Sequence, residues 1–167
     1  MRLLLLFIIV PFATLCHAQS VEKRYTNFIG NNGIVYFFYP KKLKKLEGME
    51  KFSYDITCSS KSDTAILNFS IYSLEPAETK KLTMHNGNDS IESISCKTLF
   101  VDVEDKGYKT RCSTTFLLSD LKKMYKNKST LYFKLLLKEG IACKANYRKR
   151  EWKKESSVIT RILNSIY

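Results

Sequence analysis

Four cysteines carry most of the reactive chemistry that this sequence offers. They are Cys58, Cys96, Cys112 and Cys143, and a fifth, Cys16, lies in an N-terminal segment that we expect to be removed. Each of the four falls on the apolar side of an alternating pattern, so all four are expected to face the core. An even number of cysteines in an exported domain predicts two disulfide bonds, and four cysteines allow three pairings. Buried free thiols that act as small hydrophobic side chains are the alternative.

Other chemistries find little support in the sequence. No CxxC pair suggests a zinc site, and the patterns GxSxG, HExxH, P-loop and Rossmann glycine run are missing. A thiol nucleophile needs a neighbouring base, and His85, the last residue of a predicted strand, lies at a predicted turn where we expect it to be solvated. There are two acidic groupings, Glu75 with Glu78, and Asp102 with Glu104 and Asp105. Both flank predicted turns, so we expect these side chains to be solvated. We therefore expect no enzyme activity and no cofactor. A hydrolase that acts through two carboxylates is the alternative.

Three Asn-x-Ser sequons, at Asn68, Asn88 and Asn127, match the N-glycosylation pattern. Asn68 lies on the outward parity of its strand, and the other two lie in predicted turns. All three are therefore expected to be accessible, and they matter only in a host that glycosylates such sites.

Residues 1–18 have the layout of a secretory signal peptide. A basic start is followed by the apolar run Leu3–Val10, by Pro11, and by small residues at Cys16 and Ala18. The apolar run is too short to span a bilayer. We expect cleavage after Ala18, which leaves residues 19–167 as a single domain without a transmembrane segment. The expected location is the periplasm or the outside of the cell.

Basic residues outnumber acidic ones by 28 to 16. Lysines occur in pairs beside apolar residues, at Lys41-Lys42, Lys44-Lys45, Lys80-Lys81, Lys122-Lys123 and Lys153-Lys154. A cationic surface predicts an anionic partner, such as an envelope component or an acidic glycan. Export disfavours nucleic acid. The scatter of these pairs along the chain favours a simpler interpretation, in which polar faces of strands and helices merely use lysine.

The elements that position these residues follow mainly a period of two, which is typical of half-buried strands. Phe52–Cys58 and Ala65–Ile71 alternate on either side of a polar turn and predict a hairpin. Residues 91–103 also read as a strand, but its apolar parity switches, which predicts a bulge or a break near Lys97. Further strands are predicted at 34–39, 80–85, 108–118, 131–137 and 141–147. Ser119 is expected to cap a short helix in which Leu121, Met124 and Tyr125 share a face.

The C-terminal stretch RKREWKKESSVITRILNSIY predicts an amphipathic helix. One face carries the apolar side chains, namely Trp152, Val158, Ile159, Ile162, Leu163 and Ile166, and the opposite face carries Arg150, Lys153, Lys154 and Arg161. We expect the apolar face to dock on the core, with a membrane-surface helix as the alternative. Glu155 lies inside the apolar sector, so either the packed stripe begins after it or it pairs with a cation.

About eight strands with these two helices predict a mainly β fold. The expected form is an antiparallel β-sandwich or curled sheet, with a short helix and a C-terminal amphipathic helix packed on it.

The second half of the chain also carries a recurring order of motifs. TTFLLS is followed by SDLKKMY, by LYFKLLL, by a glycine turn and by EWKKESSVITRILNSI. Residues 108–166 thereby resemble uncharacterised small exported proteins of Gram-negative bacteria. The resemblance implies a β-sandwich domain outside the cytoplasm, and it implies no catalytic or ligand-binding residue.

These patterns predict an exported binding domain without a catalytic site. Its partner is expected to be a protein or an anionic envelope or glycan component. The contact is expected either on a sheet face with exposed aromatic and lysine side chains or around the C-terminal helix. A periplasmic immunity or inhibitor protein is the alternative within the same compartment.

Overall fold

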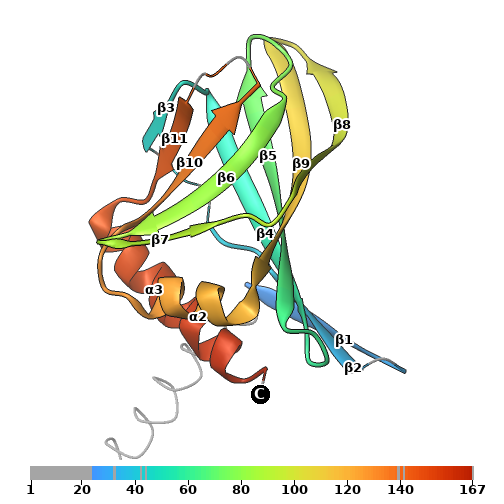
Figure 1. Ribbon diagram of the computed structural model, residues 1–167, viewed down its shortest axis with the longest axis vertical. Coiled ribbons are helices and arrows are strands. Elements are labelled where there is room, and N and C mark those ends of the chain that lie inside the picture. Colours follow the sequence, from blue (N-terminus) through green and yellow to red (C-terminus); the bar gives the residue numbers. More distant parts are fainter. Residues whose placement is uncertain are drawn as a thin grey trace, which may run out of the picture.

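In the part of the chain that the structure, a computed structural model, describes, the elements are two antiparallel sheets and two helices (Figure 1). The structure describes residues 24–166 apart from 32, 42, 44, 139 and 141, so the predicted signal peptide lies outside the described residues. The predicted fold class is confirmed. The described residues hold eleven strands rather than about eight, because the sequence analysis missed two short polar strands and read two others as one.

The first sheet has six strands in the order β1-β2-β4-β5-β9-β8. Its strands are β1 (Tyr25–Gly30), β2 (Gly33–Phe38), β4 (Lys51–Ser59), β5 (Thr64–Ser73), β9 (Gly107–Leu117) and β8 (Cys96–Glu104). The second sheet has five strands in the order β3-β11-β10-β6-β7. Its strands are β3 (Lys45–Glu47), β11 (Ala142–Asn146), β10 (Leu131–Leu137), β6 (Thr79–Asn86) and β7 (Asp89–Glu92). The helices α2 (Leu118–Lys126) and α3 (Lys149–Asn164) lie together at one end of the sheets (Figure 1).

The core lies between the inner faces of the two sheets. In β4 and β5 the predicted alternation holds, with Phe52, Ile56, Leu67 and Phe69 each fully buried. The ring of Phe52 lies 5.3 Å from that of Phe133 in β10, so the two sheets meet directly through aromatic contacts.

The expected strand over residues 91–103 is in fact two strands in different sheets. β7 ends at Glu92, the chain crosses over at residues 93–95, and β8 begins at Cys96. Ile94 lies in this crossing and is 63% exposed. A register shift between Thr98 and Phe100 adds a second irregularity. This register shift matches the bulge or break that was expected near Lys97, whereas the change of sheet at residues 93–95 was not predicted.

Helix α2 begins one residue before the expected cap. Leu117 occupies the N-cap position without a side-chain hydrogen bond, so the prediction of Ser119 as the cap is wrong. The backbone N–H of Leu118 instead donates to the carbonyl of Asp63, 2.7 Å away. The predicted face is nevertheless correct, because Leu121, Met124 and Tyr125 are buried.

Helix α3 docks on the core through its apolar face. Trp152, Ile159, Ile162, Leu163 and Ile166 are buried, and the half-buried Val158 packs against them. Packing therefore begins at Trp152, ahead of Glu155. Glu155 is itself buried and pairs with Arg24, which agrees with the second of the two arrangements expected for it.

Three tyrosines form the surface on which this helix packs. The Tyr54 hydroxyl lies 2.7 Å from the hydroxyls of both Tyr125 and Tyr147, inside the core. The Trp152 ring lies 5.5 Å from the Tyr125 ring and 5.4 Å from the Tyr147 ring. The sheet, α2 and α3 thus meet at one hydrogen-bonded aromatic cluster.

This cluster predicts a loss of stability in alkali. Burial raises the pKa of the Tyr54, Tyr125 and Tyr147 hydroxyls above the ordinary value of 10.0. The unfolded chain releases these protons near pH 10 while the folded protein retains them, so their contribution is complete below pH 10 and is lost as the pH rises. Each tyrosine adds up to about 1.4 kcal/mol per pH unit to that decline.

Urea unfolding between pH 8 and pH 11.5 measures this slope. Tyr54→Phe should give a shallower decline than the wild-type protein above pH 10, whereas Tyr39→Phe, at an exposed position, should leave the slope unchanged. Equal slopes for wild-type protein and Tyr54→Phe would show that the buried hydroxyls do not govern alkaline stability.

Candidate functional site

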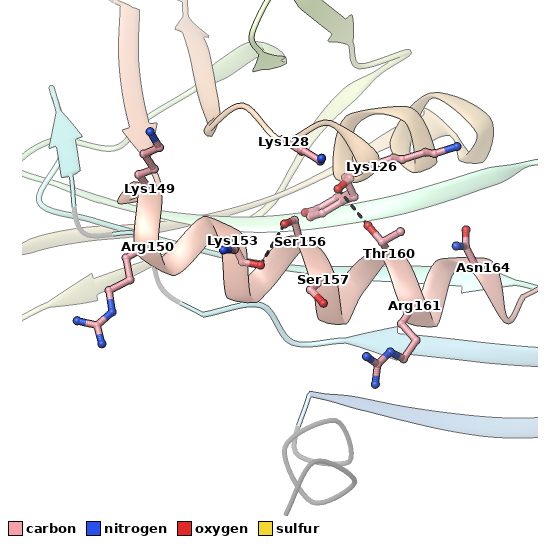
Figure 2. Close-up of a pocket in the computed structure, with 11 residues that line it drawn as sticks. Lys126, Lys128, Lys149, Arg150, Lys153, Ser156, Ser157, Thr160, Arg161 and Asn164 are labelled. Carbon is pink, nitrogen blue, oxygen red and sulfur yellow. Dashed lines mark hydrogen bonds between the residues drawn. The ribbon is translucent and has the colours of Figure 1, made fainter. Parts of the chain in front are cut away.

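The outward face of α3 lines a groove that it shares with the end of α2 (Figure 2). Side chains three or four positions apart on a helix share a face, and this face carries Lys149, Arg150, Lys153, Ser156, Ser157, Thr160, Arg161 and Asn164. Tyr125 and Lys126 of α2, with Lys128 just after it, complete the lining. The groove has a volume of about 910 Å³, which falls within the usual range of ligand sites.

The charge of this groove is entirely positive. Its lining holds six cations, Lys126, Lys128, Lys149, Arg150, Lys153 and Arg161, and no carboxylate. All six are exposed, and none forms an ion pair within the part of the chain that the structure describes. Nearby Lys123, by contrast, pairs with Asp89 at 2.8 Å. No ion pair among the described residues offsets these six charges, which give the groove a positive potential.

The middle of the groove is lined by small hydroxyl side chains. Ser156, Ser157 and Thr160 lie between the basic N-terminal part of α3 and Arg161 (Figure 2). The Thr160 hydroxyl donates to the carbonyl oxygen of Tyr125 at 3.0 Å, which ties the two helices together along the groove. Short side chains allow a ligand to approach the helix closely, and their hydroxyls supply further hydrogen bonds.

The cations are spread along the groove and across it. Lys149 and Arg161 are twelve positions apart in α3, which corresponds to about 18 Å along the helix axis. Figure 2 shows Arg150 and Arg161 projecting from one side of α3, while Lys126 and Lys128 come from the side of α2. A ligand that lies along α3 would therefore meet positive charge on both flanks.

The opposite face of α3 holds this surface in place. Arg24 donates through Nη1 to both carboxylate oxygens of Glu155, at 2.8 and 3.1 Å. The backbone N–H of Lys41 donates to Glu155 Oε1 at 3.0 Å. Together with the packing of Trp152 in the tyrosine cluster, these contacts attach the buried face of α3 to the rest of the domain. The basic face is thus presented on a rigid element.

This face is only partly predictable from the sequence. Arg150, Lys153 and Arg161 were expected opposite the apolar stripe and do line the groove, whereas Lys154 is exposed outside it. Lys126 and Lys128 were missed, because nothing in the sequence shows that the end of α2 lies beside α3. Part of the basic charge is therefore gathered into one surface, which the scatter along the chain had argued against.

The cysteines form no disulfide in this structure. Cys58, Cys112 and Cys143 are buried as expected, Cys96 is half-buried, and all four are free thiols. The prediction of two disulfide bonds among these four cysteines is therefore wrong for this structure. Burial raises the pKa of the Cys58 thiol to about 12 and also raises that of Cys143, so neither is an activated nucleophile.

His85 does not lie in a turn, contrary to the sequence analysis. It belongs to β6, on the outer face of the second sheet, and its ring stacks on that of Tyr132 at 4.7 Å. Burial, together with Lys134 and Lys144, lowers the pKa of His85 and keeps the imidazole neutral near pH 7. The cysteine side chains in the core lie on the other side of the sheets, so His85 is not placed as their base.

Two of the five acidic residues in the groupings predicted to be solvated lie in surface ion pairs. Glu78 pairs with Lys138, and Asp102 pairs with Lys109. Glu104 and Asp105 line a hollow of about 240 Å³ that they share with Glu50 and two lysines. Within the described residues, no group of three or more His, Cys, Asp or Glu side chains is arranged to hold a metal ion.

The three sequons differ in accessibility. The Asn68 amide donates to Asp55 at 3.0 Å, and the Asn127 amide donates to the Asn86 carbonyl and to Asp89, both at 3.1 Å. Asn88 is exposed in the turn between β6 and β7. Of the three side chains, Asn88 is therefore the most open to modification.

None of the helices in the described part of the chain is long and apolar enough to cross a membrane. No protein-family model matches the chain, and neither a curated protein nor a solved structure shows significant similarity to it.

Proposed function

We propose that this protein is an exported binding domain that holds an acidic glycan in the groove between α2 and α3. The observation that carries the proposal is the groove itself, where six exposed cations face one space without a carboxylate among them. The N-terminal signal pattern and the resemblance of residues 108–166 support a location in the envelope or outside the cell. Polymers that carry carboxylate, phosphate or sulfate groups occur there.

The spread of charge favours an extended polyanion over a small ion. Exposed ion pairs contribute only about 0.2–1 kcal/mol each, so useful affinity requires several of them at once. Cations along about 18 Å of helix match the charges on several successive sugar residues. Arginine at both ends of the face adds bidentate contacts to carboxylate, sulfate or phosphate groups.

The same lining supports binding rather than catalysis. The groove brings together Lys, Arg, Ser, Thr, Tyr and Asn side chains, with no histidine, cysteine or carboxylate to act as a general base. The Ser156 hydroxyl donates to the backbone carbonyl of Lys153 at 3.5 Å, and the lining offers neither serine a histidine–carboxylate pair. Their role in the proposal is to donate hydrogen bonds to the ligand.

Removing cations from the groove should weaken glycan binding much more than removing the same number of cations elsewhere on the surface. We expect Lys149→Gln/Lys153→Gln/Arg161→Gln to raise the Kd for a labelled sulfated glucosamine–uronate hexasaccharide about 10- to 100-fold, measured by fluorescence anisotropy at low salt. The control Lys61→Gln/Lys80→Gln/Lys106→Gln loses the same three charges at exposed positions outside the groove. It should change the Kd by less than threefold.

Two further anionic probes test whether the groove prefers a glycan over other ligands of similar charge. Phosphatidylglycerol vesicles and a single-stranded DNA oligonucleotide of matched charge should bind more weakly than the hexasaccharide, and all three should weaken with salt. An equal loss for the groove variant and its control would contradict the proposal. So would wild-type protein that prefers the vesicles or the DNA.

A further inference from the structure

The backbone carbonyls at the end of α2 are hydrogen-bonded from two sides. The last carbonyls of a helix have no partner inside the helix, so they must find one outside it. In α2 the Met124 carbonyl accepts a hydrogen bond of 2.7 Å from the buried side-chain amide of Asn86 in β6. The next carbonyl, that of Tyr125, accepts from the Thr160 hydroxyl of α3 at 3.0 Å. The end of α2 is therefore attached both to the second sheet and to α3.

A reciprocal pair of asparagines continues this attachment beyond the helix. Asn127 is the C-cap residue of α2, where the backbone becomes extended. Its side-chain amide donates to the Asn86 carbonyl and to Asp89, both at 3.1 Å, and the Asn86 amide in turn reaches the Asn127 carbonyl at 3.3 Å. Asn127 Oδ1 also accepts from the Ser129 N–H at 3.0 Å. We call Asn86 and Asn127 the asparagine clamp.

The turn between β6 and β7 lies close against the segment that follows α2. Gly87 in this turn has a φ of +64°, and a Cβ at this position would lie 2.9 Å from the Ser129 hydroxyl oxygen. Glycine meets both demands, since it adopts positive φ readily and has no Cβ. Asp89 at the end of the same turn binds Lys123 of α2 at 2.8 Å. The turn thus holds the end of α2 by close packing and by an ion pair, in addition to the clamp.

This segment carries the two groove cations that do not belong to α3. Lys126 is the last residue of α2, and Lys128 is separated from it only by Asn127. Figure 2 shows both lysines on the α2 side of the groove, across from the residues of α3. The backbone around Asn127 therefore sets where these two cations lie.

We infer that Asn86 and Asn127 are positioning residues of the glycan groove, which fix the end of α2 so that Lys126 and Lys128 face the cations of α3. The inference rests on the proposed function, and it adds residues that act without touching the ligand. Neither asparagine belongs to the lining of the groove. The Asn86 side chain is fully buried, so it is out of reach of a ligand.

A fixed α2 side lowers the cost of binding a ligand that lies between the two helices. Such a ligand must meet the cations of both helices at the same time. If the end of α2 moved freely, binding would also have to order that segment, and the lost chain freedom would offset part of the affinity. Exposed ion pairs are individually weak, so the two lysines contribute most when their backbone is already in place.

Alanine at position 127 tests the clamp while both lysines remain. We expect Asn127→Ala to raise the Kd for the sulfated hexasaccharide about 3- to 5-fold at low salt, since the α2 side must then be ordered on binding. Asn86→Ala should act in the same direction, and thermal unfolding of each variant confirms that it is folded at the temperature of the measurement. The control Asn68→Ala removes another half-buried amide, which donates to Asp55 at 3.0 Å in the first sheet, and should leave the Kd unchanged.

A double-mutant cycle shows whether the clamp acts through the lysines. Lys126→Gln/Lys128→Gln should raise the Kd about 5- to 10-fold by itself. In that background Asn127→Ala should have little further effect, because the clamp then holds no cation. A merely structural role would weaken binding by the same factor in both backgrounds, and that result would overturn the inference. So would an unchanged Kd for Asn127→Ala or for the double lysine variant.

Hydrogen exchange of the free protein gives a readout that needs no ligand. The backbone N–H of residue 127 donates to the Lys123 carbonyl and closes the last turn of α2. Its exchange should become about 10-fold faster in Asn127→Ala, while amides in the middle of α3 keep their rates. Unchanged exchange at residue 127 would overturn the inference, because the amide would then not fix this segment.

The α3 variant Lys149→Gln/Lys153→Gln/Arg161→Gln separates this inference from the proposed function. If that variant loses affinity relative to its control while Asn127→Ala binds like the wild-type protein, the glycan groove stands and the positioning role falls. If that variant and its control lose affinity equally, the groove itself is contradicted, and the positioning role falls with it.

Discussion

Replacing Trp152 with alanine is expected to lower the free energy of unfolding by about 3–5 kcal/mol. We expect this to be the largest loss for any single substitution of a buried side chain in α3. Trp152 is only 1% exposed, and its ring packs on both Tyr125 and Tyr147. The alanine variant leaves a cavity where α2, α3 and β4 meet. A domain of this size has a total stability of about 5–15 kcal/mol, so the loss should be plain in urea unfolding.

Two control variants show whether the loss comes from the Trp152 ring itself. Lys153→Ala changes the adjacent, exposed position and should cost less than about 0.5 kcal/mol. Trp152→Phe should cost far less than alanine, because the ring stays and the indole Nε1 has no hydrogen-bond partner within the described residues. A loss below 1 kcal/mol for Trp152→Ala would mean that α3 is not docked through this side chain.

Breaking the buried ion pair should have the second largest effect. Arg24→Met leaves Glu155 as an uncompensated carboxylate whose side chain is only 4% exposed. We expect a loss of about 3 kcal/mol, at the low end for such pairs because the Lys41 N–H still donates to Glu155. The loss would be measured by urea unfolding at pH 7.

A double-mutant cycle separates the ion pair from simple packing. Arg24→Met/Glu155→Leu replaces both charges by apolar groups of similar size and should recover stability to within about 1 kcal/mol of the wild-type protein. The coupling energy between the two sites should then exceed 1 kcal/mol. Additive losses in the double variant would show that Arg24 and Glu155 act independently.

Elements with strong periodicity were predictable from the sequence. Phe52–Cys58, Ala65–Ile71 and the apolar face of α3 carry regular patterns, and burial in the structure follows them with few exceptions, such as the buried Ser70 and Glu155. Short strands with polar composition were not predictable: β1 exposes most of its side chains, and β3 has only three residues. Such strands are held by pairing with neighbours, which leaves no periodic signal in their own residues.

The candidate site was only half predictable for a related reason. The basic face of α3 follows from helical spacing alone, which placed Arg150, Lys153 and Arg161 together. The contribution of Lys126 and Lys128 depends on how α2 packs against α3, a tertiary contact. His85 was misplaced for a similar reason, because polar residues after Met84 read as a turn while β6 continues to Asn86.

The location of the bound ligand tests the central claim most directly. Amide chemical shifts of the exported, isotope-labelled protein would be followed while the sulfated hexasaccharide is added. The basic groove predicts that the largest changes occur at Lys149–Asn164 and around Lys126 and Lys128, with little change in the outer face of the second sheet. Largest changes around Tyr132 and Lys144 on that sheet, with α3 unaffected, would contradict it.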